Sequence, residues 1–156
     1  MKFKLQTFTE TLIPIIYKLD KTFYGETVKP DWYNRYVNKA KIVMCYCNNE
    51  LAGYLIAARI TKKLFNEIIS CKYSGDISIN PNNFAFKSHY YYLSSVLVLP
   101  PYQGNGIATK LQDIVFNKVL QNKKVCTICV TDGGESLAKK HLSFIGKSNN
   151  SKIYSN

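Results

Sequence analysis

Short stretches of the chain alternate between apolar and polar positions, or run apolar throughout, as strands do. The alternation over residues 2–8 predicts a half-buried first strand, and the apolar runs 42–47 and 51–60 predict two more. Asn48 and Asn49 stand between these two runs, and this residue type accepts the positive φ angles of a tight turn. The pattern therefore predicts a β-hairpin near the middle of the chain.

Two further strands are predicted in the second half. The Tyr-rich run 89–99 ends at Pro100-Pro101, and proline cannot donate a hydrogen bond to a neighbouring strand. The run 125–130 is apolar on both faces, which predicts a buried strand. Ile153-Tyr154 is expected to add only a very short last strand.

Helical periodicity predicts the remaining elements. Apolar residues spaced three and four apart predict helices over 9–23, 31–39, 106–122 and 136–144, with Gly146 ending the last one. Residues 61–88 show no sustained period and predict an insertion that holds a short helix near 64–70 and one extra hairpin. The order of elements indicates a single α/β (α+β) domain over residues 1–156.

Composition narrows the class of protein. Hydrophobic residues make up 46% of the 156, and no run of 18 lacks a charge, so we expect a packed core and no membrane span. Five cysteines, an odd number, predict free thiols in a reducing compartment and hence a cytoplasmic protein. Cys126 and Cys129 have the spacing of a redox motif, but on one strand they point to opposite faces.

The net charge of +11 raises the question of an anionic partner. Nucleic acid is one candidate, since binding to phosphates depends on basic side chains. The basic residues are scattered lysines, however, with Arg35 and Arg59 the only arginines, and proteins that read phosphates and bases rely on arginine forks. A nucleic-acid partner is therefore considered but not favoured.

Residues 103–109 carry the strongest chemical signal. They follow the predicted strand 89–99 and open the predicted helix, where unpaired backbone N–H groups attract a phosphate. Gly104 and Gly106 leave the backbone open to such an anion. No Lys-Ser/Thr pair follows at the spacing of a P-loop, and the three glycines of a dinucleotide fingerprint are absent.

The longer segment Val98–Leu111 closely resembles the central motif of the GCN5-related N-acetyltransferase (GNAT) superfamily. Gln103, Gly106 and Ala108 match its three defining places, and Asn49–Leu55 looks like the family's second hairpin. The resemblance covers nearly the whole chain. It implies a GNAT-type mixed, largely antiparallel central sheet with helices on both faces.

The resemblance also implies a function and a cofactor site. Acetyl-coenzyme A would donate its acetyl group to a primary amine by direct attack in a ternary complex. Val125–Val130 would splay away from the strand before the motif, at a bulge, and the backbone of Leu97 and Val98 would bond the pantetheine arm. The residues that would hold the pyrophosphate are Gln103, Gly104, Asn105, Gly106, Ile107, Ala108 and Thr109.

One part of the family pattern is missing. The last helix of the family usually carries a tyrosine that protonates the leaving thiolate, and Leu142 stands in its place here. His141 and Ser143 flank that position and are candidates for the missing acid. At the start of the strand before the motif, His89 and Tyr92 are further candidates for acid/base work. Ser94 and Asp132 are expected to border the same splay.

The acceptor itself is left open. The loss of the tyrosine suggests a catalytically degenerate acyl-coenzyme A-binding module as one alternative, and the charge suggests an RNA-linked amine such as aminoacyl-tRNA as another. Polycationic acceptors usually need an acidic cleft. Only four acidic residues are expected where a cleft could form, so polycations rank below other amines: Glu26, Asp31, Asp132 and Glu135. The protein is expected to be a monomer or a homodimer, with no metal.

Overall fold

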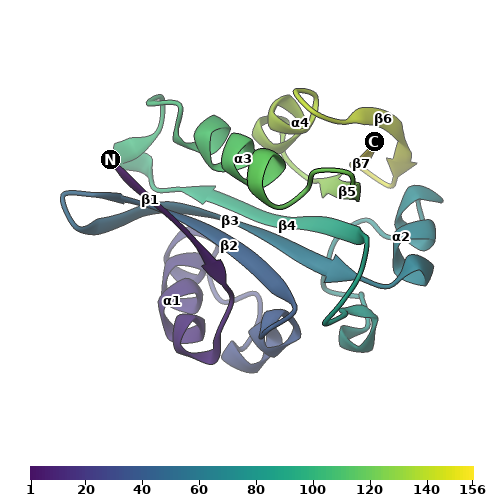
Figure 1. The fold of residues 1–156 in the computed structure, drawn as a ribbon, viewed down its shortest axis with the longest axis horizontal. Coiled ribbons are helices and arrows are strands. Elements are labelled where there is room, and N and C mark those ends of the chain that lie inside the picture. The colour runs from purple at the N-terminus through teal and green to yellow at the C-terminus, as the bar shows by residue number, and fades with distance from the viewer.

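The computed structural model describes residues 1–156, which form one seven-stranded sheet with helices against it (Figure 1). The strand order is β1-β2-β3-β4-β5-β7-β6. All neighbours are antiparallel except β4 and β5, so the predicted mixed, largely antiparallel sheet is confirmed. The strands are β1 (Lys2–Thr7), β2 (Ala40–Cys47), β3 (Glu50–Ile60), β4 (Tyr90–Val98), β5 (Lys124–Cys129), β6 (Ser143–Ser148) and β7 (Ser151–Ser155).

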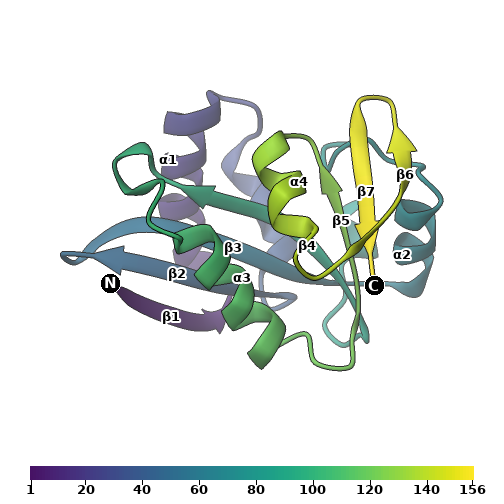
Figure 2. The same ribbon diagram turned by 90° about the horizontal axis from the view of Figure 1, so that it is seen from above.

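Helices cover both faces of the sheet, as predicted. The pair α1 and η2 lies on one face, while α3 and α4 lie on the other (Figures 1 and 2). None of them combines the length and the apolar character that a membrane crossing requires. The α-helices are α1 (Ile13–Tyr24), α2 (Lys62–Ile69), α3 (Ile107–Lys118) and α4 (Asp132–Ala138), and the 3₁₀ helices are η1 (Glu10–Leu12), η2 (Pro30–Tyr36), η3 (Pro81–Asn83) and η4 (Pro100–Tyr102).

β3 is buried on both of its faces, which explains its uninterrupted apolar sequence. Tyr54 and Ile56 pack into the apolar cluster under α1 and η2. Leu55 belongs to the second cluster, under α3 and α4. The cysteines of β5 divide in the same way, because Cys126 lies in the first cluster and Cys129 in the second, as strand geometry predicts.

The β2–β3 hairpin forms where the sequence predicts it. Asn48 and Asn49 have φ angles of 51° and 63°, in the left-handed region that asparagine accepts more readily than most residues. The hairpin places β3 inside the sheet, between β2 and β4.

The central pair of strands parts halfway along its length. Residues Tyr90–Leu93 of β4 pair with Lys124–Thr127 of β5. The rest of β4, which continues to Val98, has no partner in β5. The pairing of β4 with β3 shifts by one residue near Ser94, which has no partner in the register and forms a bulge. Beyond this point β4 and β5 run in diverging directions (Figure 2). The bulge and the splayed strand implied by the family resemblance are confirmed.

The segment 61–88 contains the predicted short helix but not the predicted extra hairpin. The Thr61 side chain caps α2 by accepting a hydrogen bond of 3.2 Å from the N–H of Leu64. After α2 the chain forms a loop and then η3, and a single isolated bridge joins Ile60 to Phe84. Pro81, at the start of η3, cannot donate to a strand partner, so the loop does not continue as a ladder.

The predicted helix over 31–39 is wrong in type and in length. Residues 30–36 form the 3₁₀ helix η2, which ends because Asn38 takes a φ of 59° and β2 begins at Ala40. The left-handed turn redirects the chain into the sheet two residues earlier than the periodicity suggests.

The C-terminal prediction needs a larger correction. α4 covers Asp132–Ala138 and not 136–144, because Thr131 caps it by accepting a 3.1 Å bond from the N–H of Gly134. Residues 143–155 form a closing hairpin, where the sequence predicts only a very short strand at Ile153-Tyr154. Gly146 lies within β6 and does not end a helix, and Asn149, with a φ of 53°, makes the turn.

Gly53 allows β3 and β4 to approach each other next to the parting of the sheet. A Cβ atom on this residue would lie 2.6 Å from the carbonyl oxygen of Leu97. Because that contact is with backbone, at the last pair of the β3–β4 ladder, one of the two strands would have to move.

We therefore expect Gly53→Ala to lower the free energy of unfolding by about 1–3 kcal/mol, the usual cost of overpacking. Urea denaturation measures this. Gly75→Ala is the matched control, since its Cβ would meet nothing within 4 Å and should change stability little. Equal stability of the two variants would contradict the close approach.

Candidate active site

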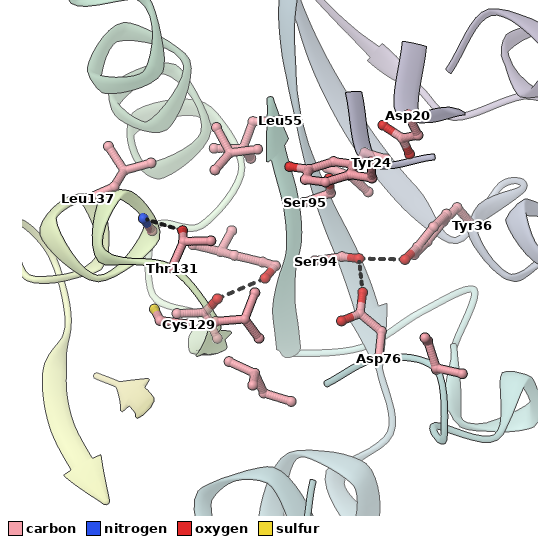
Figure 3. A pocket seen from close by; sticks show the side chains of 18 of the residues that line it. Asp20, Tyr24, Tyr36, Leu55, Asp76, Ser94, Ser95, Cys129, Thr131 and Leu137 are labelled. Carbon is pink, nitrogen blue, oxygen red and sulfur yellow. Dashed lines mark hydrogen bonds between the residues drawn. The ribbon is translucent and has the colours of Figure 1, made fainter. Parts of the chain in front are cut away.

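A cavity of about 360 Å³ occupies the opening between β4 and β5. Its lining comes from both faces of the sheet. Tyr36 and Asp76 belong to the side of α1, η2 and the 61–88 segment, while Leu137 and Thr131 belong to the side of α4 (Figure 3). The cavity therefore connects the two faces through the gap that the parted strands leave.

The apex of this opening is closed by a side chain. The hydroxyl of Thr127 donates a bond of 2.9 Å to the carbonyl of Leu93, the last pair of residues in the β4–β5 register. From there on, Ser94, Ser95 and Val96 of β4 line the cavity. The edge of β4 that faces β5 is unpaired over this length, while its other edge stays bonded to β3.

Asp76, from the 61–88 segment, is the first of two carboxylates in the cavity. It accepts hydrogen bonds from the hydroxyl of Tyr92, at 2.9 Å, and of Ser94, at 3.0 Å. The Ser94 hydroxyl also bonds that of Tyr36 (Figure 3). Burial raises the pKa of the Asp76 carboxyl, and the two bonds to it partly counter this rise because they favour the charged form.

Asp20, from α1, is the second carboxylate. Its oxygens accept bonds from Tyr33, at 2.5 Å, and from Tyr54. Burial raises the pKa of Asp20 too, against the effect of these two bonds. The two acids lie on the same side of β4 in Figure 3.

These carboxylates correct the expected acidic cleft. None of the four residues predicted for it lines the cavity, namely Glu26, Asp31, Asp132 and Glu135. Glu135 instead fastens α4 to β7, accepting bonds from Lys152 at 2.6 Å and from Tyr154 at 2.9 Å. With Lys139 as a third donor, these bonds lower the pKa of Glu135 to about 2. No local pattern marks Asp20 or Asp76, which reach the cavity only through the tertiary fold.

The loop before α3 has the form of an anion site. Gly104 and Gly106 have φ angles of 79° and 70°, and a Cβ on either would meet no atom within 4 Å, so their outer face is open. The six consecutive N–H groups of residues 104–109 donate to no acceptor within the protein. Together with the N-terminus of a 12-residue helix, they can bind a phosphate group.

Side chains hold this loop in shape. The Gln103 amide donates a 2.9 Å bond to the carbonyl of Val98, and the Asn105 amide donates one of 3.1 Å to that of Tyr102. Ile107 is buried in the second apolar cluster and anchors the start of α3. Lys140 donates a 2.6 Å bond to the Thr109 hydroxyl, which adds a positive charge beside the loop.

Two polar atoms of the cavity wall are left without a partner. The Oε1 atom of Gln112, on α3, is buried and accepts no hydrogen bond, and the Nε1 atom of Trp32 donates none. Buried polar atoms are nearly always bonded, so these two are unusual unsatisfied groups within the protein.

The candidate acid/base residues lie elsewhere. His141 contacts Asp113 at 3.2 Å and stacks on Phe116, Ser143 is exposed on the edge strand β6, and neither lines the cavity. His89 precedes β4, at the end away from the opening. Tyr92 is fully buried and reaches the cavity only through its bond to Asp76.

Leu142, the expected place of the family's tyrosine, is not on a helix. It follows the end of α4 and is buried in the second apolar cluster. Of the predicted cofactor-binding residues, Leu97 and Val98 lie at the end of β4 just beyond the part that lines the cavity.

The parted strands β4 and β5 and the open loop before α3 place the protein in the class of acetyltransferases. Comparison with known proteins identifies the family. The model of the acetyltransferase (GNAT) family matches residues 13–136. The chain belongs to this family. No curated protein sequence matches it.

Solved structures share the fold over nearly the whole chain. The loading GNATL domain of CurA from Lyngbya majuscula has a TM-score of 0.68 at 12% identity, covering 99% of this chain and 97% of that one. NAA60 of Arabidopsis thaliana in complex with acetyl-CoA has a TM-score of 0.64 at 13% identity, covering 99% and 98%. The PaiA N-acetyltransferase of Thermoplasma acidophilum with coenzyme A has 0.62 at 10%, covering 100% and 99%.

The hydroxyl bonds to Asp76 lead to a titration experiment. Tyr92→Phe removes a donor that favours the ionised carboxylate, so the pKa of Asp76 should rise further above its ordinary value. Carboxyl ¹³C shifts followed against pH measure it. Tyr91→Phe is the control, because Tyr91 packs into the opposite cluster. A wild-type Asp76 that titrates at or below 3.8 would contradict the burial of its carboxyl.

Proposed function

We propose that the protein is an N-acetyltransferase that moves an acetyl group from acetyl-coenzyme A to a primary amine by direct attack in a ternary complex. Membership of the GNAT family supports the transfer chemistry. The observation that carries the proposal is the cavity through the sheet, because it lets two molecules meet from opposite faces. Relatives of the same fold were solved with acetyl-CoA and with coenzyme A.

The residues of the α3 side fit such a cofactor. The six free N–H groups of residues 104–109 suit a diphosphate. When bound, acetyl-coenzyme A supplies the activated acetyl thioester. The proposed binding set is Leu97, Val98, Gln103, Gly104, Asn105, Gly106, Ile107, Ala108 and Thr109.

β4 contributes through its unpaired edge. The backbone of Ser95, Val96 and the residues that follow faces the opening without a strand partner, so it is free to bond the amides of an extended arm. Because β4 remains bonded to β3 on its other edge, this template is rigid. A rigid row of N–H groups orients a bound thioester and can stabilise negative charge on its oxygen.

We extend the proposal to the domain organisation and the cellular location of the protein. The chain forms one acetyltransferase domain over 1–156, and 61–88 is an insertion that supplies part of the acceptor side. Cys45, Cys126 and Cys129 are buried with free thiols, which supports a reducing compartment such as the cytoplasm.

Gly106→Val tests the cofactor loop. A valine at a φ of 70° is strained, and its side chain would project over the open N–H groups. We expect coenzyme A to bind more weakly by about 2 kcal/mol or more, or roughly 30-fold in Kd, since several charge-assisted bonds are lost together. Isothermal titration of both proteins measures the change, with circular dichroism as the folding check.

The matched control is Asn122→Val. Asn122 has a φ of 59° beyond the other end of α3, so the variant carries similar backbone strain away from the loop. It should bind coenzyme A as wild type does. Wild-type protein without affinity for coenzyme A would disprove the proposed function, while binding without transfer to any amine would favour a degenerate binding module.

His141→Ala tests the acid suggested by the sequence. Since the imidazole lies outside the cavity, beside Asp113 and Phe116, we expect the rate of acetyl transfer to change by less than about threefold. Steady-state kinetics with a saturating amine measure it. A loss of tenfold or more, with binding of coenzyme A intact, would return His141 to the mechanism.

A further inference from the structure

The cavity has a charge opposite to that of the protein. The chain has 21 basic and 10 acidic residues, yet no lysine, arginine or histidine lines the cavity. The only formally charged side chains in its wall are Asp20 and Asp76. A negatively charged pocket in a strongly positive protein selects for cations and against anions.

Neither carboxylate forms an ion pair within the protein. Tyr33 and Tyr54 bond Asp20, and Tyr92 and Ser94 bond Asp76, so every side-chain donor is a neutral hydroxyl. The five ion pairs of the protein include neither acid. Shielded carboxylates are ordinarily paired with a cation, and the missing partner here has room in the adjoining cavity.

Arg35 lowers the pKa of the Asp76 carboxyl through its charge, but its hydrogen bonds go to carbonyl groups. It bonds the carbonyls of Trp32 at 3.0 Å and Ile79 at 3.1 Å, with a longer contact of 3.5 Å to that of Asp76. Arg35 therefore fixes the loop that carries Asp76 and forms no ion pair with the carboxylate.

The walls around the acids are aromatic and apolar. Trp32, Tyr33 and Tyr36 come from η2, and Tyr24 from the end of α1, where its ring lies beside Asp20 and Ser95 (Figure 3). Aromatic faces attract ammonium groups as well as apolar surface. At about 360 Å³ the whole cavity is near the lower limit for small-molecule sites, and part of it adjoins the cofactor side.

We infer that the acceptor is a compact primary amine with an apolar body and no anionic group, bound as its ammonium ion by Asp76 and Asp20. This inference rests on the proposed acetyl transfer and names the acceptor for it. The two acids hold the cation on the η2 side of β4, and the aromatic wall holds the body. Amino acids with a free carboxylate are rejected by the same charges.

The first test compares three ligands of one shape on the wild-type protein. The probes are 2-phenylethylamine, 2-phenylethanol, which replaces the ammonium by a neutral hydroxyl, and L-phenylalanine, which adds a carboxylate. Titration calorimetry in the presence of coenzyme A should show the amine binding at least about tenfold more tightly than either of the others. Acetylation assays with acetyl-coenzyme A should rank 2-phenylethylamine above L-phenylalanine and above a tripeptide amide.

The second test uses charge-removing variants. Asp76→Asn and Asp20→Asn should each weaken binding of 2-phenylethylamine by about tenfold or more and leave binding of 2-phenylethanol and coenzyme A within about threefold. Asp31→Asn is the control, since Asp31 lies on η2 but not in the cavity wall. Retained binding of coenzyme A shows that a variant is folded.

The outcomes separate the two proposals. Equal binding of amine and alcohol by the wild-type protein, or undiminished amine binding in both variants, overturns the inference even if acetyl transfer is found. Preferred acetylation of the peptide amide also overturns it. If one variant does not fold, the other variant and the wild-type ligand series decide. If the wild-type protein does not bind coenzyme A, the proposed function is overturned. The preference for the amine in the calorimetry tests the acceptor inference separately.

Discussion

The loss of pairing between β4 and β5 beyond Leu93 and Thr127 is the constraint on which the site depends. Parallel neighbours normally satisfy each other's backbone groups along their whole length. Here the ladder stops, a threonine hydroxyl closes its end, and the bulge at Ser94 turns β4 away. The result is an opening framed by strands and not by mobile loops. The strands supply the rigid part of its wall, and α3 and the loop that carries Asp76 complete it.

The opening also separates two electrostatic environments. On the α3 side, a helix N-terminus, a row of free N–H groups and Lys140 favour phosphate. On the η2 side, Asp20 and Asp76 have only neutral donors. The sheet keeps the two environments apart, so an anionic cofactor and a cationic acceptor do not compete for one surface. The overall positive charge of the protein favours the anionic cofactor, whereas only the cavity favours the cationic acceptor.

The sequence predicted those features that depend on local chemistry. Asn48 and Asn49 at the hairpin, the alternating strands and the glycines before α3 all act through backbone conformation within a few residues. The acids of the cavity could not be found in this way, because Asp20 and Asp76 are 56 positions apart and are joined only by the fold. The closing hairpin was missed because Gly146 was interpreted as a helix stop, although cross-strand bonds to β7 decide its place.

The attachment of the Asp76 loop has a consequence for how the protein can diverge. The loop lies between α2 and η3, is held by Arg35 and by a bond of 2.6 Å from the Ser151 hydroxyl to the carbonyl of Ser74, and contributes no strand to the sheet. Its sequence can therefore change while the residues of the α3 loop remain as they are. Mutation and selection can change the Asp76 loop and keep the loop before α3. The descendants would then share the acetyl donor but modify different acceptors.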